Sequence, residues 1–137
     1  MYKRLTHIGI AVKSLDKSSE LFARLLGARH DHTEEVAAQK VKAAFFRVGE
    51  GGIELLEPTG IDSPIARFIE KRGEGVHHLS FEVDDLDAEI ARLKKEGFQM
   101  IDETPRAGAD GFRIAFLHPK STNGVLVEIS EKVDSHL

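Results

Sequence analysis

Short runs of apolar residues, separated by glycine, proline and charged residues, divide the chain into strands and a few helices. Runs rich in β-branched and aromatic residues predict strands over residues 5–12, 41–48, 53–56, 76–83, 98–101, 113–117 and 125–129, with a weaker one over 28–36. Helical periodicity predicts helices over residues 15–26 and 86–96, each followed by a glycine. A third helix is expected from Ser63-Pro64 to near Gly73. This mixture predicts an α+β fold.

The second half of the chain repeats the order of the first, which is a strand, a helix and then three strands. An offset of 71 residues places His7 on His78. Glu54 falls on Glu128 at an offset of 74, because the second copy has a longer turn. The offset of 71 also matches Ala44-Phe45 with Ala115-Phe116. The repeat predicts a duplicated βαβββ unit.

The duplication defines the expected domain organisation. We interpret residues 1–137 as a single domain, with module one over about 1–60, a connector over 61–75 and module two over about 76–132. A module of this size buries little surface alone, so we expect the two to share one core. The predicted fold is therefore two tandem βαβββ modules that form a shared curved mixed β-sheet.

The composition narrows the function classes. The chain has 19 basic and 23 acidic residues and a formal charge of −4, whereas nucleic-acid-binding domains carry a basic excess, so we expect no nucleic-acid partner. The absence of cysteine excludes disulfides and thiolate metal sites, so any metal ion must be bound by nitrogen and oxygen. No signal or membrane segment is visible, which predicts a cytoplasmic protein without a membrane partner. A mature organelle protein whose transit peptide has been removed would show the same pattern.

Four residues at matching positions of the repeat form a candidate metal site. His7 and His78 lie on the first strand of each module, and Glu54 and Glu128 lie on the last. A pseudo-two-fold axis would bring both pairs to one central place. Two imidazoles and two carboxylates suit a borderline divalent cation such as cobalt, nickel, zinc, manganese or iron. The cation would also neutralise acids in strongly apolar strands, although an acid of this kind taken alone more often faces solvent from a half-exposed strand.

The other histidines are weaker candidates. His77 is adjacent to His78 on one strand and faces the opposite side, so only one of the two can point into the site, and the repeat selects His78. We expect a packing or hydrogen-bonding role for His77. Surface positions are expected for the other four, which are His30, His32, His118 and His136.

Several longer motifs accompany these residues. They are Asp-Ser-Pro-Ile-Ala (62–66), Gly-Glu-Gly-Val-His-His (73–78), Val-Asp-Asp-Leu (83–86), Asp-Glu-Thr-Pro-Arg-Ala-Gly (102–108), Ile-Ala-Phe-Leu-His-Pro-Lys-Ser-Thr (114–122) and Gly-Val-Leu-Val-Glu (124–128). With the duplicated order and the His, Glu, His, Glu set, the chain resembles the vicinal oxygen chelate superfamily of glyoxalases, bleomycin resistance proteins and dioxygenases. Its second half is similar to the methylmalonyl-CoA epimerase family within that superfamily.

The resemblance implies a metal-dependent epimerase that interconverts (R)- and (S)-methylmalonyl-CoA through a metal-stabilised enolate. His7, Glu54, His78 and Glu128 match the metal ligands, with cobalt favoured and nickel, zinc or manganese as other candidates. Inversion needs a proton removed on one face and returned on the other, so Glu128 and Glu54 are the expected catalytic bases, with a water relay as the alternative to Glu54. Some members carry a further glutamate near the position of Ala43, where this chain has no carboxylate.

The partners and the alternative functions follow from the same resemblance. An acyl-CoA substrate and a homodimer are expected. Coenzyme A phosphates need cations, for which the nearby candidates are Arg67, Lys71, Arg72, Arg106, Arg113 and Lys120. One alternative is a glyoxalase I (lactoylglutathione lyase)-like isomerase, which uses the same four ligand positions. Another is a binding module such as an antibiotic-sequestering protein, although those commonly lack the metal ligands.

Overall fold

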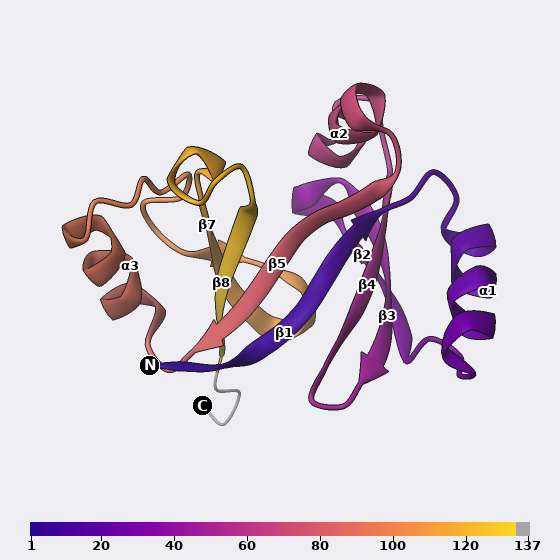
Figure 1. Ribbon diagram of the computed structural model, residues 1–137, viewed down its shortest axis with the longest axis horizontal. Helices are drawn as coiled ribbons and strands as arrows, with labels where there is room; N and C mark the ends of the chain where they lie inside the picture. Colours follow the sequence, from indigo (N-terminus) through magenta and orange to yellow (C-terminus); the bar gives the residue numbers. More distant parts are fainter. Residues whose placement is uncertain (134–137) are drawn as a thin grey trace. The chain divides into compact units, whose positions relative to one another are not determined.

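The structure is a computed structural model, and it describes residues 1–133 (Figure 1). Its strands are β1 (Tyr2–Ala11), β2 (His32–Val36), β3 (Val41–Val48), β4 (Gly51–Pro58), β5 (Gly75–Val83), β6 (Arg106–Ala107), β7 (Phe112–Leu117) and β8 (Leu126–Lys132). Its helices are α1 (Leu15–Leu26), α2 (Pro64–Arg72) and α3 (Leu86–Lys95), with short 3₁₀ turns η1 (Ala37–Gln39), η2 (Ala109–Gly111) and η3 (Pro119–Ser121). No helix within residues 1–133 is long and apolar enough to span a membrane.

Local signals in the sequence set the helix ends. The Ser14 hydroxyl accepts a hydrogen bond from a first-turn amide of α1, and Gly27 ends that helix in the left-handed conformation at φ 68°. Ser63 and Asp85 cap α2 and α3 in the same way. These caps explain why the predicted helix bounds agree with the observed ones to within about one residue.

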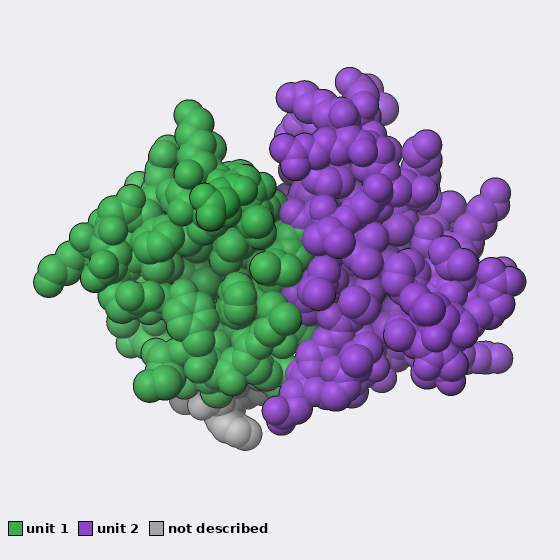
Figure 2. Space-filling view, viewed as in Figure 1, with its two compact units in different colours: residues 1–6, 78–137 green, residues 7–77 purple. Residues whose placement is uncertain are grey.

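Two compact units make up the chain, and Figure 2 colours them separately. Unit 1 comprises residues 1–6 and 78–137, and unit 2 comprises residues 7–77. The strand order is β1-β5-β8-β7-β6 in unit 1 and β2-β3-β4-β1 in unit 2. Strand β1 begins in unit 1 and continues into unit 2, so the first six residues belong with the second copy of the repeat.

Strand pairing confirms the duplicated βαβββ order. In unit 2, β1 runs parallel to β4 with Gly9 opposite Glu54, and in unit 1, β5 runs parallel to β8 with Ser80 opposite Glu128. Each of these last strands also pairs antiparallel with the strand before it. The α+β class and the tandem modules are therefore confirmed.

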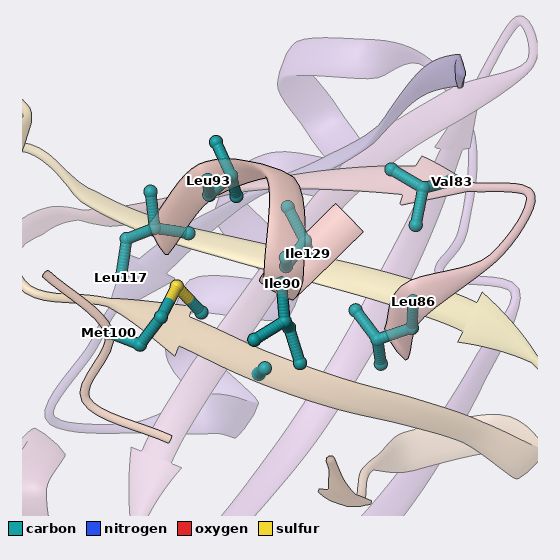
Figure 3. Close-up of a cluster of buried hydrophobic side chains, with 8 residues drawn as sticks. Val83, Leu86, Ile90, Leu93, Met100, Leu117 and Ile129 are labelled. Atoms are coloured by element: carbon teal, nitrogen blue, oxygen red, sulfur yellow. The ribbon is translucent and has the colours of Figure 1, made fainter. Parts of the chain in front are cut away.

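Unit 1 has its hydrophobic core on the face of the sheet that α3 covers. Leu86, Ile90 and Leu93 lie along one side of α3 and pack onto β5, β7 and β8 (Figure 3). Ile129 is fully buried in this cluster. Side chains alternate between the faces of a strand, so the opposite face of this sheet presents the other set, which includes His78 and Glu128.

Unit 2 divides its core between two helices. One cluster lies under α1 and includes Leu15 and Phe46, and another lies against α2 and includes Ala43 and Ile65. Helix α1 buries only Leu15 fully, whereas the predicted apolar face also included Leu25, which is 71% exposed. The apolar periodicity of α1 therefore extends beyond the contacts that this helix makes within unit 2.

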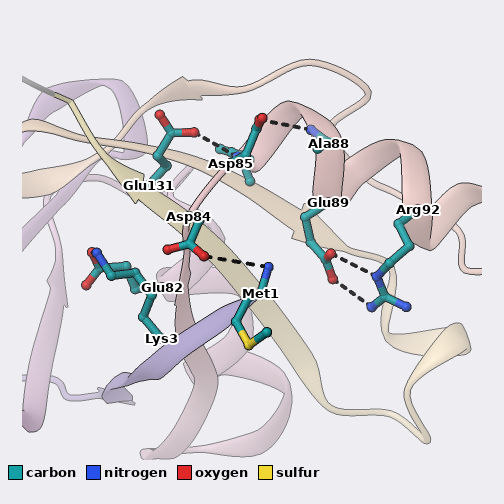
Figure 4. A network of polar contacts seen from close by, with 10 residues as sticks. Met1, Lys3, Glu82, Asp84, Asp85, Ala88, Glu89, Arg92 and Glu131 are labelled. Carbon is teal, nitrogen blue, oxygen red and sulfur yellow. Dashed lines mark hydrogen bonds and ion pairs between the residues drawn. The ribbon is translucent and has the colours of Figure 1, made fainter.

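A polar network joins the N-terminal residues to the start of α3 in unit 1 (Figure 4). The amino group of Met1 lies 3.9 Å from Asp84 Oδ2. Asp85 and Glu131 each accept a hydrogen bond from a backbone amide of the first turn of α3. Carboxylates are favoured here because the first turn leaves amides without helical partners and carries a partial positive charge.

The strand predicted over residues 98–101 is wrong. Of these residues only Met100 pairs, in an isolated bridge to Leu117. Met100 instead adds its side chain to the α3 core, which explains the apolar pattern without a ladder. The two-residue strand β6, with both side chains exposed, gave no apolar signal and was not predicted.

Candidate metal and acid–base site

The first His–Glu pair lies in unit 2. His7 on β1 and Glu54 on β4 are brought together by the parallel pairing of these strands, with His7 Nε2 3.2 Å from Glu54 Oε1. Both side chains are largely buried, with 15% and 13% of their surface exposed. An acid at this depth within an apolar strand needs a charged or hydrogen-bonding partner.

The second pair lies at the equivalent place in unit 1. His78 on β5 and Glu128 on β8 have Nε2 and Oε1 4.0 Å apart, and their side chains are only 5% and 9% exposed. Both residues stand on the face of the sheet opposite the α3 core. The structure therefore brings each predicted pair together within its own unit, and the second pair is the more deeply buried.

Burial raises the pKa of Glu128 to about 7 because the charged form loses its hydration. The nearby Ser80 hydroxyl and the Arg106 guanidinium act in the opposite direction and lower this pKa, while Asp102 raises it. Ser80 is almost completely buried, and its hydroxyl makes no hydrogen bond of normal geometry within residues 1–133.

An aromatic ring backs each pair. Phe45 lies opposite Glu54 in the ladder and meets the His7 ring edge to face at 6.5 Å between centroids. Phe116 lies opposite Glu128 and meets His78 in the same way at 6.0 Å. The match of Ala44-Phe45 with Ala115-Phe116 carried this signal, but its role beside the acids was not recognised from the sequence.

Ala43 occupies the position where a further glutamate was expected in some family members. It lies on β3 two residues from Phe45, so both side chains share one face of the strand. Ala43 is 4% exposed and belongs to the apolar cluster against α2. This environment suits a methyl group and provides no carboxylate.

The remaining histidines have other surroundings. His77 packs edge to face on Phe68 at 4.9 Å, and its burial lowers its pKa to about 4. His118 caps η3 by accepting a hydrogen bond from the Lys120 amide. His32 stacks on Phe45 and keeps 39% of its side chain exposed, while the ring of His30 lies against Phe46. The predicted surface position of His136 lies outside the described residues.

The donor atoms of each pair fit a borderline divalent cation. Each pair offers one imidazole nitrogen and one carboxylate, the ligand types that such ions take when thiolates are absent. Burial penalises the charged form of Glu128, as its raised pKa shows. A bound cation would favour that charged form.

Comparison with known proteins places the chain in a class. Residues 6–116 match the family model of the Glyoxalase/Bleomycin resistance protein/Dioxygenase superfamily, and the chain belongs to this superfamily. It is 46% identical to YqjC, an uncharacterized protein of Bacillus subtilis, over 97% of this chain and 96% of that protein.

Within the superfamily the chain groups with the methylmalonyl-CoA epimerases. It is 39% identical to the human mitochondrial methylmalonyl-CoA epimerase, over 93% of this chain and 73% of that protein. The structure superposes with a TM-score of 0.93 on a variant of Streptomyces coelicolor methylmalonyl-CoA epimerase solved in complex with 2-nitronate-propionyl-CoA. The identity there is 37%, with 97% of this chain and 96% of the other covered.

Proposed function

We propose that this protein is a metal-dependent methylmalonyl-CoA epimerase that interconverts the (R) and (S) thioesters. The duplicated His–Glu pair, repeated with the same strand pairing and the same flanking phenylalanine, carries the proposal. The similarity to named epimerases along nearly the whole chain supports this substrate. The same relatives favour the epimerase over the glyoxalase I alternative.

A single divalent cation, with cobalt as the first candidate, is held by His7, Glu54, His78 and Glu128 in this proposal. The equivalent ladder positions of the two pairs, and the matching donor types that they offer, support it. When bound, the cation would act as a Lewis acid toward the negative charge that develops on the thioester oxygen.

The two glutamates perform the proton transfers. The reacting carbon lies between a thioester carbonyl and a carboxylate, which makes its hydrogen acidic. Glu128 takes this proton, and the electron pair of the broken C–H bond passes into the thioester carbonyl. Glu54, which starts the cycle protonated, gives its proton to the opposite face while the electron pair returns from the oxygen to form the new C–H bond, so the configuration inverts. Exchange of protons with solvent then restores both glutamates. His7 and His78 keep the carboxylates in place through the pairs described above.

Separate Glu54→Gln and Glu128→Gln variants test these roles. We expect each variant to lose epimerisation, while exchange of the substrate hydrogen in deuterated water survives for one epimer only, because one base still works. Metal content is measured alongside. A Glu54→Gln variant that keeps the metal and full epimerisation would show that Glu54 is not the second base.

The remaining assignments belong to the same proposal. An acyl-CoA is the small-molecule partner, the protein acts in the cytoplasm as a homodimer, and residues 1–137 form one domain with the module bounds given above. Neither nucleic acid nor membrane is a partner. Light scattering after size-exclusion chromatography tests the dimer, since a monomer mass would contradict it.

A further inference from the structure

Beyond the metal ligands and the two bases, a charged side chain stands beside the Glu128 pair in unit 1. Arg106 on β6 has Nε 3.3 Å from Asp102 Oδ1 and its Cζ 5.5 Å from the centre of the Phe116 ring. We infer that Arg106 binds the free carboxylate of the substrate and so selects carboxylated acyl thioesters over uncharged ones. This inference rests on the proposed function for its substrate class.

Asp102, the ion-pair partner of Arg106, is itself hydrogen-bonded to strand β7. Asp102 is only 16% exposed, and its second oxygen accepts a hydrogen bond from the Phe116 amide at 2.8 Å. The carboxylate therefore holds the arginine through Nε and the strand through Oδ2. The ring of Phe116 supports the guanidinium plane. A side chain fixed in this way loses little entropy when it binds a ligand.

Arg106 also lies on the correct face of the sheet. It pairs with Ile114 in the ladder, two residues before Phe116, so it projects on the side that carries Glu128 rather than on the α3 side. The Phe116 ring against which Arg106 lies belongs to the residue directly opposite Glu128 in the ladder. The Arg106 side chain keeps 45% of its surface exposed, so the guanidinium is accessible to a ligand.

The guanidinium of Arg106 keeps donors that can bind the carboxylate of a substrate. One Asp102 oxygen occupies Nε, and the terminal amino groups of the fork can bind both oxygens of a second carboxylate. Methylmalonyl thioesters carry their carboxylate on the reacting carbon. A group that binds it close to Glu128 therefore also orients the C–H bond toward the base.

Two other arginines provide matched controls. Arg113 on β7 is balanced by two acids, Asp87 at 3.2 Å and Glu131 at 3.4 Å, and it pairs with Glu131 in the ladder, on the α3 side of the sheet. Arg47 in unit 2 lies over Phe45 at 5.7 Å and 3.2 Å from Asp31 Oδ2, which repeats the Arg106 arrangement. Arg47 and Asp31 are more exposed, at 59% and 45%.

The test compares two ligands that differ only at the carboxylate. Malonyl-CoA and propionyl-CoA are titrated calorimetrically into wild type, Arg106→Gln and Arg106→Lys, each with and without cobalt. We expect Arg106→Gln to lose about ten- to one-hundred-fold in affinity for malonyl-CoA while propionyl-CoA binds as in wild type. Arg106→Lys restores part of the loss, because the charge remains without the fork. Arg113→Gln and Arg47→Gln keep the wild-type ratio of the affinity for malonyl-CoA to that for propionyl-CoA.

The outcomes separate this inference from the proposed function. Equal weakening of both ligands by Arg106→Gln, or a ratio lost in Arg47→Gln instead, would overturn the assignment of Arg106. Wild-type epimerisation of methylmalonyl-CoA is measured in the same preparations. If wild type is active and Arg106→Gln keeps the wild-type affinity ratio, only the inference is contradicted. If wild type is inactive and Arg106→Gln loses that ratio, only the epimerase function is contradicted.

Discussion

The two His–Glu pairs occupy equivalent ladder positions but different environments. The side chains of His7 and Glu54 are 15% and 13% exposed, and their Nε2 and Oε1 atoms are 3.2 Å apart. The side chains of His78 and Glu128 are 5% and 9% exposed, and the same two atoms are 4.0 Å apart. The residue opposite the acid also differs, since Gly9 faces Glu54 and Ser80 faces Glu128. The two copies therefore share the strand pairing of the His–Glu pair, but they differ in how deeply the pair is buried and in the residue opposite the acid.

The helices that cover the two units differ in the same direction. Helix α3 buries Leu86, Ile90 and Leu93 against its sheet, whereas α1 buries only Leu15 fully. Glu128 stands on the face of the unit 1 sheet opposite α3, so the burial that raises its pKa comes from that other face and not from this helix. The comparison shows that α3 covers its sheet more completely than α1 does.

The largest expected effect is on metal affinity. His7→Ala and His78→Ala each remove one proposed ligand, and we expect each to weaken cobalt binding by at least about 100-fold in a chelator competition. Losses from both variants would support one shared site. A loss from His78→Ala alone, with His7→Ala binding as wild type, would break the equivalence of the two pairs.

The next effect concerns the coverage of the two sheets. Ile90→Ala on α3 removes a side chain that is 5% exposed and should cost about 2–5 kcal/mol in urea unfolding. Leu25→Ala on α1, where 71% is exposed, should change stability by less than about 0.5 kcal/mol. Equal losses would mean that the two helices contribute similarly to stability.

The pKa of Tyr2 measures how well the N-terminal residues pack within unit 1. Burial raises its pKa to about 12, and the neighbouring Glu89 adds to the shift. Because the folded pKa lies above the unfolded value of 10, the stabilisation is complete below pH 10 and is lost as pH rises toward 12. This is the only tyrosine and there is no tryptophan, so phenolate absorbance follows it directly.

The matching control is the same titration in denaturant, where a midpoint of about 10 is expected. A folded-state midpoint of 10 would contradict the burial of Tyr2. In Glu89→Gln the folded midpoint should move down toward 10, since one of the two causes is removed.

The smallest effect is expected in acid. Arg92 holds the pKa of Glu89 below its ordinary value through two hydrogen bonds of 2.9 and 2.7 Å. A lowered folded pKa gives stability that is present above the unfolded value of 4.5 and is lost as pH falls below it. At pH 7 the urea midpoint of wild type should therefore lie above that of Glu89→Gln. At pH 3.5 the midpoints of the two proteins should lie close together. Glu20→Gln on α1 should leave both midpoints at wild-type values.

Much of the fold could be predicted because its signals are local. Ser14 and Gly27 fix α1, and alternating or β-branched runs fix β3 and β5. The start of β1 was predicted three residues too late, because Lys3 and Arg4 look like a polar terminus. Both pair with Glu82, a residue far along the chain, and such a contact leaves no trace in a local pattern.

The site could be predicted only through the repeat. His7, Glu54, His78 and Glu128 are each ordinary in isolation, and their matching positions singled them out. Ser80 stands opposite Glu128 where Gly9 stands opposite Glu54, and the Arg47–Asp31 pair that resembles Arg106–Asp102 comes from a different strand, so the alignment of the repeat gave no indication of these residues. Their role depends on which face of a strand they occupy and how deeply they are buried, and these properties come from tertiary packing.

The most direct test of the account follows methylmalonyl-CoA in deuterated water by proton NMR, with cobalt-loaded protein and with protein stripped of metal by a chelator. The account predicts that the loaded protein replaces the hydrogen on the reacting carbon and equilibrates the two epimers, that stripping abolishes both, and that added cobalt restores them. Full activity after verified removal of all metal, or no exchange in the loaded protein, would contradict it.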